Sequence, residues 1–299
     1  MSKGENPVVQ QRRLRTELRR IREDAGMFQK DVAEAMDWGA SKLIRIETGA
    51  VGIAKTDLIA LLQHYGVNDQ TRVDRLVELA RDSRKPAWWD AYKDVYTQQF
   101  LTFLGFEASV KVLRQFQVQT LPGLLQTREY AAEVIRSYGN PPNVISRGVD
   151  VRLRRQEVLD RDDANYFFIL DEAVVRRQVG GREAWRTQLE RLKKENLRPN
   201  VTIRIARFDI GSYIGMKGAF TLFEFPYEDA DFALSLEYAH RDVLIPNDPE
   251  QAADFLETFY KLESVAAPES DTEKIIDEIL AAFPATDASK KENQTPETT

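Results

Sequence analysis

The sequence predicts an α+β protein of two domains, in which an all-α domain of five helices precedes a larger α+β domain with a mostly antiparallel sheet. Apolar residues recur at three- and four-residue steps over residues 12–84, as they do on the buried faces of amphipathic helices. Pro86 interrupts that pattern. After residue 163, several short segments are rich in β-branched and aromatic residues, and some alternate as half-buried strands do.

The first part of the chain predicts five short helices. The first carries Leu14, Leu18 and Ile21 on one face and ends at Gly26, while Gly49 closes the third. The predicted helices span residues 12–25, 29–36, 40–48, 55–65 and 71–84. Together they complete a compact unit, so we expect residues 1–85 to fold alone.

Composition predicts four segments along the chain. Residues 1–10 are polar without a period and predict a disordered arm. Residues 11–85 form the helical domain and residues 86–284 the α+β domain. The segment at 285–299 is rich in Ser, Thr, Lys and Glu and predicts a disordered tail.

The larger domain mixes helical and strand patterns. Helices are predicted at residues 107–138, 143–161, 172–179, 182–197, 249–264 and 271–283. Strands are predicted at residues 164–170, 201–208, 218–225 and 231–238. We expect about four strands in one sheet, covered by helices.

Composition limits the chemistry that the chain can perform. There is no cysteine, and His64 and His240 are the only imidazoles, so we expect no metal and no cofactor. The net charge of −6 argues against coating nucleic acid or an anionic membrane, yet residues 1–85 hold more Lys and Arg than Asp and Glu. Residues 1–13 lack the apolar stretch of a signal peptide, and no segment resembles a membrane span. We therefore expect a cytoplasmic protein without a membrane partner.

Residues 29–48 meet the demands of two short helices that cross closely. Ala33 is small where the helices would cross, and Leu43 and Ile46 anchor the second helix. At the bend, Asp37 takes the place where a glycine with a left-handed backbone is common, which Asp tolerates better than most residues. The exposed or partly exposed positions of the second helix are Ala40, Ser41, Lys42, Ile44 and Arg45.

The helix pair resembles the Cro/CI-type (XRE) helix-turn-helix family. The resemblance covers residues 12–66 and rests on Gln29, Val32 and Ala33 and on the segment SKLIRIETG at 41–49, whose I-E-x-G ending is common in that family. It implies a sequence-specific DNA-binding transcriptional regulator that binds a pseudo-palindromic operator as a homodimer. The alternative is an ordinary helical hairpin with a solvated basic face.

The same resemblance implies which residues contact DNA. Gln29 and Lys30, at the start of the first helix, contact the phosphate backbone. On the second helix, Ser41, Lys42 and Arg45 approach base edges, and Ala40 lies on the same exposed face. Arg is suited to a bidentate contact with guanine. Arg12, Arg13 and Arg15 either bind phosphates or form a solvated face.

The larger domain also resembles a known family. Segments from FEASVKVLRQFQVQTLPGLLQTREYAAEVI to GAFTLFEFP, within residues 88–284, resemble the C-terminal domain of actinobacterial regulators of the WhiJ type. Such regulators are typically encoded beside a small partner protein, in an arrangement likened to antitoxin and toxin. The resemblance therefore implies a small protein partner encoded by a neighbouring gene, and the alternative is a small-molecule ligand. The segment LPGLLQTREY at 121–130 predicts either a corner in the core, which we favour, or a binding edge.

The sequence carries no motif of an enzyme, and we expect none. There is no Gly-rich phosphate loop after a strand, no HExxH and no GxSxG. The nearest candidate for a catalytic site is Asp171 and Glu172, which lie where a strand meets a helix and where carboxylates can act as acid or base. Acidic residues in a first helical turn more often interact with the helix dipole, which is the interpretation that we favour. His64 and His240 are expected to be structural, and RLRRQEVL at 152–159 to be a solvated helix face rather than an anion site.

Overall fold

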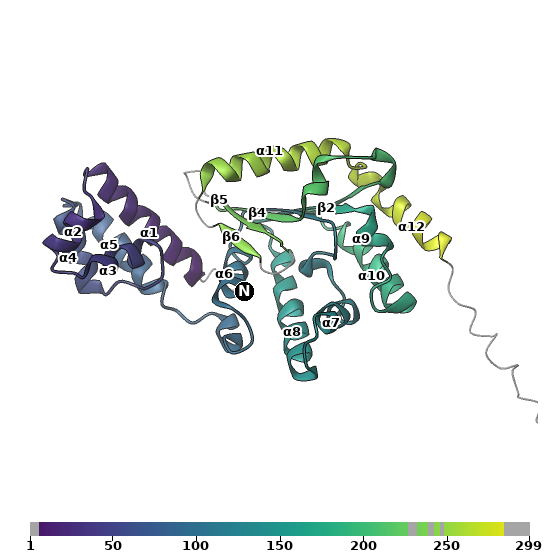
Figure 1. Ribbon diagram of the computed structural model, residues 1–299, viewed down its shortest axis with the longest axis horizontal. Helices are drawn as coiled ribbons and strands as arrows, with labels where there is room; N and C mark the ends of the chain where they lie inside the picture. The colour runs from purple at the N-terminus through teal and green to yellow at the C-terminus, as the bar shows by residue number, and fades with distance from the viewer. Residues whose placement is uncertain (1–5, 227–231, 239–241, 246–247, 284–299) are drawn as a thin grey trace, which may run out of the picture. The chain divides into compact units, whose positions relative to one another are not determined.

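The chain divides into two compact units, Met1–Ser109 and Val110–Thr299. A computed structural model of the chain is shown in Figure 1. The residues that it describes are 6–226, 232–238, 242–245 and 248–283. The predicted tail at 285–299 lies outside the described residues.

The first unit is helical. Its helices are α1 (Pro7–Asp24), α2 (Gln29–Ala35), α3 (Ala40–Glu47), α4 (Lys55–His64), α5 (Gln70–Asp82), the 3-10 helix η1 (Trp88–Tyr92) and α6 (Gln98–Glu107). One apolar cluster joins the first five of these helices, and it includes Leu18, Val32, Leu43, Leu58 and Leu76. The prediction of five helices before Pro86 is therefore confirmed.

The helix α1 begins earlier than predicted, so the prediction of a disordered arm is wrong for residues 7–10. Pro7 occupies the first helical turn, where its missing N–H costs nothing. The side chain of Asn6 caps the helix, because its Oδ1 accepts a hydrogen bond from the Val8 N–H at 3.0 Å. Val9 is buried. The Asn-Pro pair is a helix-start signal that outweighs the polar composition around it.

The first unit also extends past Pro86, where the sequence placed the domain boundary. The helix α6 packs on the start of α1, and a Cβ added at Gly105 would lie only 2.5 Å from the Val8 Cβ. Arg12 is 2% exposed, and its guanidinium lies 5.4 Å from the centroid of the Phe106 ring. The helix α6 therefore packs on the N-terminal half of α1, and residues 86–109 belong to the helical unit.

The second unit contains a six-stranded mixed sheet in the part of the chain that the structure describes. The strands are β1 (Val112–Gln117), β2 (Asn165–Asp171), β3 (Val201–Ala206), β4 (Phe220–Glu224), β5 (Phe232–Leu236) and β6 (Val243–Ile245). Their order is β3-β2-β1-β4-β5-β6. The strands β1, β2 and β3 pair in parallel, whereas β1 with β4, β4 with β5, and β5 with β6 pair antiparallel. The α+β class is confirmed, and the sheet mixes both orientations.

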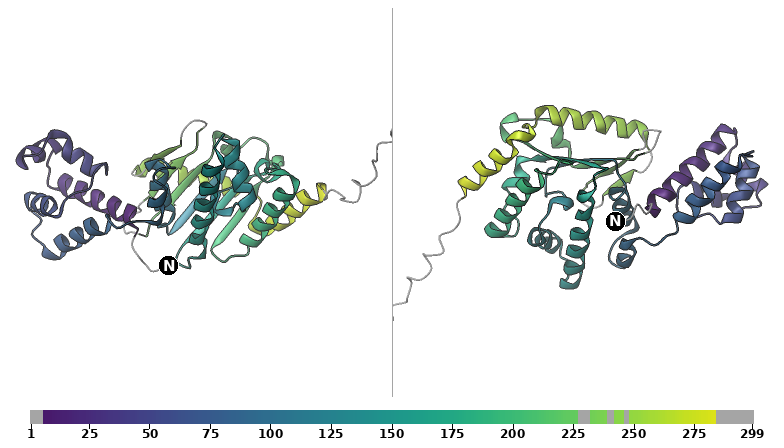
Figure 2. Two further views of the ribbon diagram at one scale, coloured as in Figure 1. Left: turned by 90° about the horizontal axis from the view of Figure 1, so that it is seen from below. Right: turned by 180° about the vertical axis from the view of Figure 1, so that it is seen from behind.

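Helices cover both faces of this sheet. They are α7 (Arg128–Ser137), α8 (Pro142–Arg155), α9 (Glu172–Arg176), α10 (Gly181–Glu195), α11 (Pro249–Val265) and α12 (Thr272–Ala282). The helix α11 lies over one face, and α7, α8 and α10 lie on the other side of the sheet (Figures 1 and 2). The helix α12 contacts α10 and β3.

The strand β1 corrects the helix predicted over residues 107–138. It is a central strand, which pairs with β2 in parallel and with β4 antiparallel. All but one of its residues are buried, so the alternation typical of a half-buried strand is masked. The conformation of this segment is decided by pairing with β2 and β4, which are distant in the sequence. A search for periodicity within the segment does not reveal such pairing.

The segment at 121–130 forms a corner in the core, in agreement with the interpretation that we favoured. Leu124, Leu125 and Tyr130 are fully buried. Gln188 holds the backbone of this corner, because its Nε2 donates to the Leu125 carbonyl at 2.7 Å and its Oε1 accepts from the Thr127 N–H at 2.6 Å. Glutamine side chains thereby satisfy backbone groups that burial would otherwise leave unpaired.

Residues 1–109 are expected to fold alone and to be more stable than residues 1–85. Truncation at 85 removes α6 and with it the packing of Val8 on Gly105 and of the Arg12 guanidinium on Phe106. A loss of about 2 kcal/mol from a domain of this size lowers its Tm by roughly 8–16 °C. Thermal unfolding of both fragments, followed by circular dichroism, tests this. Equal Tm values would show that α6 adds nothing to the stability of the helical unit.

Candidate nucleic-acid interface

The bend between α2 and α3 is formed by Asp37. Its φ of 52° makes it the one non-glycine residue with a positive φ in the described part of the chain. The Trp38 N–H donates to the Ala33 carbonyl at 2.8 Å and closes the end of α2. Gly39 then precedes α3 with an ordinary φ of −60°. The prediction that Asp37 takes the left-handed position is confirmed.

A buried ion pair fixes α3 against α1. Arg22 Nε donates to Glu47 Oε1 at 2.7 Å, and Arg22 Nη2 donates to Glu47 Oε2 at 3.0 Å. The guanidinium also donates to the Met27 carbonyl at 2.9 Å. The hydrogen bonds with Glu47 raise the pKa of Arg22 above its ordinary value, although burial opposes the shift. Sequence reasoning assigned no role to either residue, although the Glu of the I-E-x-G ending was a signal.

Gln29 extends this ion pair to α2. Its Nε2 donates to Glu47 Oε2 at 2.6 Å, so Glu47 at the end of α3 accepts hydrogen bonds from two other helices. The side-chain amide of Gln29 is therefore used within the domain. A phosphate would meet the backbone N–H of Gln29 rather than this amide.

The guanidinium groups of two arginines on α1 make contacts within the domain. Arg15 Nη1 donates to the Thr48 carbonyl at 2.9 Å, just beyond the last turn of α3. A Cβ added at Gly49 would lie 2.5 Å from the same nitrogen, so Gly49 leaves room for this contact. Arg12 is buried against Phe106. The phosphate-binding alternative for Arg12 and Arg15 is thus not supported.

The exposed face of α3 holds four of the positions that the sequence predicted to be exposed. Leu43 and Ile46 are buried in the core of the unit. The helix exposes the remaining face through Ala40, Ser41, Ile44 and Arg45. Ile44 is 45% exposed, which is unusual for a large apolar side chain. These positions recur at one- and four-residue steps and lie side by side on the helix.

Lys42 is separated from that set. Its Nζ lies 2.8 Å from Asp57 Oδ2 on α4 and 4.0 Å from the centroid of the Trp38 ring. By contrast, Lys30 and Arg45 are exposed, and no ion pair of either side chain is found among the described residues. Of the predicted DNA-binding side chains, Lys30 and Arg45 are therefore the cations that remain available.

Both helices of the bend begin without a side-chain cap. The residues before them are Phe28 and Gly39, and neither donates or accepts a capping hydrogen bond through its side chain. The first-turn N–H groups of a helix have no partner within the helix. Together with the positive end of the helix dipole, such groups favour phosphate oxygens.

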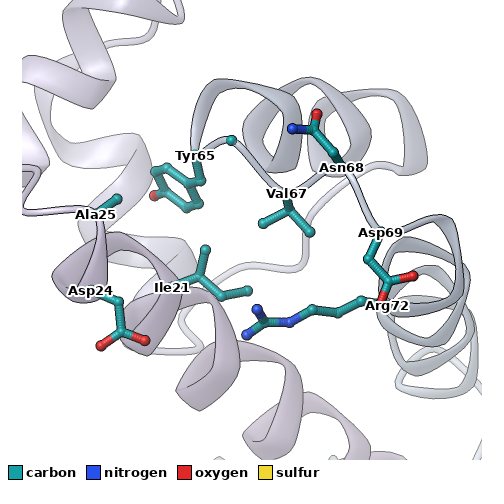
Figure 3. A pocket seen from close by; sticks show the side chains of 9 residues that line it. Ile21, Asp24, Ala25, Tyr65, Val67, Asn68, Asp69 and Arg72 are labelled. Atoms are coloured by element: carbon teal, nitrogen blue, oxygen red, sulfur yellow. The ribbon is translucent and has the colours of Figure 1, made fainter.

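Two shallow pockets occur in this unit. One of about 410 Å³ lies beside the buried ion pair, between the three helices, and is lined by Arg19, Arg22, Phe28, Gln29, Ile44, Glu47 and Thr48. The other, of about 390 Å³, lies beside the turn between α4 and α5 (Figure 3). Asp24 and Asp69 line it, and its cation Arg72 also lies 3.3 Å from Glu17. This second pocket does not suit a phosphate, because its acidic side chains outnumber its single cation.

Comparison with known families agrees with this geometry. Residues 13–76 match a family model described as a helix-turn-helix domain. Residues 100–278, more than half of the chain, match the model described as a domain of unknown function (DUF5753). The chain belongs to the DUF5753 family. No curated protein and no solved structure matches this DUF5753 protein. Its helix-turn-helix domain identifies it as a DNA-binding regulator.

The other candidate residues of the DUF5753 protein have structural contacts. Asp171 caps α9 by accepting from the Ala173 N–H at 2.8 Å, and it also accepts from the Tyr213 hydroxyl. Glu172 accepts from Arg176 Nε at 2.6 Å and from the Phe208 N–H at 2.8 Å. His240 lies outside the described residues. Within the described ranges, no helix is both long enough and apolar enough to cross a membrane.

The substitution Glu47→Gln is expected to lower the free energy of unfolding of the helix-turn-helix unit by about 3–5 kcal/mol, because it leaves the buried Arg22 guanidinium without its counter-charge. The measurement is urea unfolding of residues 1–109. Asp57→Asn is the matched control, since it breaks the half-exposed pair with Lys42 and should cost less than about 1 kcal/mol. A Glu47→Gln loss no larger than that of the control would contradict the role given to this ion pair.

Proposed function

We propose that the protein is a non-enzymatic, sequence-specific transcriptional regulator of the Cro/CI type, which acts in the cytoplasm and inserts α3 into the major groove of its operator. The observation that carries the proposal is the exposed face of α3, held in place by the buried Arg22–Glu47 pair. In this class of fold, the N-terminal residues of the second helix contact base edges while the first helix crosses the backbone.

Base reading falls to the exposed side chains of α3. Arg45 is long enough for a bidentate contact with guanine O6 and N7. Ser41 donates to or accepts from a base edge, and Ile44 offers apolar contact to a thymine methyl group. Lys42 orients α3 through Asp57 of α4, since reaching DNA would require it to leave that ion pair.

Phosphate contacts come from the start of α2. The backbone N–H groups of its first turn lack partners within the helix, and Lys30 is exposed beside them. Gln29 contributes through its backbone, because its side chain binds Glu47. Contacts of this kind position the protein and carry no sequence information.

The proposed assembly is a homodimer. A single recognition helix reads only a few base pairs, and dimers of this fold bind half-sites about one helical turn apart. The operator is then pseudo-palindromic.

Light scattering and footprinting of the full chain test the dimer. We expect a mass of twice the chain and protection of two half-sites with centres about 10 base pairs apart. A monomer that protects one short half-site would refute the dimer while leaving the DNA-binding residues in place.

We further propose that a small protein encoded by a neighbouring gene controls DNA binding through the second unit, in an antitoxin-like arrangement. The resemblance of this unit to the C-terminal domain of WhiJ-type regulators supports the proposal. Co-expression with the neighbouring gene's product, followed by pull-down, tests it. A second candidate effector is a small molecule, and the buried polar side chains of Gln117 on β1 and Thr221 on β4 favour it.

Arg45→Ala and Lys30→Ala are expected to have separable effects. Loss of Arg45 should cost about 1–3 kcal/mol on the operator and relax the preference at one base pair. Loss of Lys30 should weaken binding to all sequences alike and reduce the salt slope by about one. Binding of both variants to operator and to scrambled DNA, each over a salt series, gives the answer. An Arg45→Ala loss of equal size on both DNAs would remove Arg45 from the base-reading residues.

A further inference from the structure

Five polar side chains lie together on one face of the sheet in the second unit. Gln115 of β1 is the register partner of Thr221 of β4, and Thr221 is the partner of Ser235 of β5. Partners in register point to the same face, as do residues two apart along a strand. Gln117 therefore joins the same face, and Glu237, just beyond the end of β5, accepts a hydrogen bond from the Gln117 side chain. We call these five residues the polar row.

The other face of the same strands is apolar. Phe116, Phe220, Leu222 and Leu234 pack there against Phe259 and Leu262 of α11, in one hydrophobic cluster. All residues of the polar row except Glu237 are nonetheless buried, and Gln117 is 3% and Thr221 1% exposed. Burial of apolar side chains therefore accounts for the α11 face, but the position of the polar row needs a different explanation.

Two oxygen atoms of the polar row have no hydrogen-bond partner among the described residues. They are Gln117 Oε1 and Thr221 Oγ1, and both are fully buried. The orientation of the Gln117 amide is fixed, because its Nε2 donates to Glu237 Oε1 at 2.5 Å. Its carbonyl oxygen is thus left to accept a hydrogen bond. Buried polar groups in proteins are nearly always paired, so two unpaired oxygens on one face are a costly arrangement.

The charges around the polar row favour a cation. Burial raises the pKa of the Glu237 carboxyl, although the hydrogen bond from Gln117 opposes the rise. The charge of Asp242 adds to the rise, and that of Arg155 opposes it. Glu237 is half-buried and Asp242 is exposed, so this end of the row reaches solvent. Among the residues that the structure describes, the two carboxyls of Glu237 and Asp242 thus outnumber the one guanidinium, of Arg155, at this end of the row.

We propose that the polar row binds a small organic cation with several N–H donors, of the alkylguanidine or alkylamine class. Its N–H groups donate to Gln117 Oε1 and Thr221 Oγ1, and its positive charge lies near Glu237 and Asp242. This inference rests on the proposal that a small molecule controls the protein through its second unit. It adds the binding site and the chemical class of that small molecule.

The test uses the full chain and agmatine, which carries a guanidinium and an ammonium group. Titration calorimetry and thermal unfolding should show saturable binding and a rise in Tm. Tetramethylammonium at the same ionic strength is the control, because it carries the charge without an N–H donor. It should produce neither effect.

Two substitutions locate the binding. Thr221→Val and Gln117→Leu should each weaken agmatine binding at least tenfold. Thr202→Val is the matched control on β3, where the hydroxyl lies 3.5 Å from Glu269, and it should bind agmatine as the unsubstituted chain does. The Tm of Thr221→Val without agmatine should equal or exceed that of the unsubstituted chain, because the change removes an unpaired buried hydroxyl.

Two results would overturn the proposal. One is an agmatine response no larger than that to tetramethylammonium, and the other is agmatine binding that both substitutions leave unchanged. Operator binding by the same samples separates this outcome from failure of the DNA-binding proposal. If the chain binds its operator but not agmatine, the ligand-site proposal is refuted and the DNA-binding proposal is not.

Discussion

The position of the recognition helix depends on one buried ion pair. The helix α3 has eight residues, and Leu43 and Ile46 are its apolar anchors. Two anchors on one face leave a short helix free to rotate about its axis. The bidentate contact between Arg22 and Glu47 restricts that rotation, because the planar guanidinium donates to both carboxylate oxygens in one orientation. Gln29 adds α2 to the same carboxylate and makes the three helices one rigid unit.

Structural contacts of this kind account for several of the arginines that make residues 1–85 basic. Arg12 is buried against Phe106, Arg15 holds the end of α3, and Arg22 is paired with Glu47. These cations stabilise the domain and are not available to phosphates. In the proposed complex, few exposed cations and the helix N-termini then contact phosphates, and the α3 face supplies the sequence-specific contacts.

The elements that were predicted correctly from sequence are those whose determinants are local. The bend at Asp37, the anchors of α3 and the five helices follow from spacing and turn chemistry within about twenty residues. The strand β1 was missed because its partners lie on β2 and β4, far along the chain. The pairing of Lys42 with Asp57 was missed for the same reason, since spacing on one helix does not show which side chain approaches from the next.

The polar row shows the same limit in the larger unit. Gln115 and Gln117 flank Phe116 on β1, and polar side chains in such a short segment give no sign in the sequence that they are buried. The sheet buries both faces of β1, so the glutamines enter the interior instead of facing water. Gln188 in the same unit is also buried, but both ends of its amide are paired to backbone. Gln117 differs because only its nitrogen is paired, and that difference distinguishes a structural amide from one with an acceptor still available to a ligand.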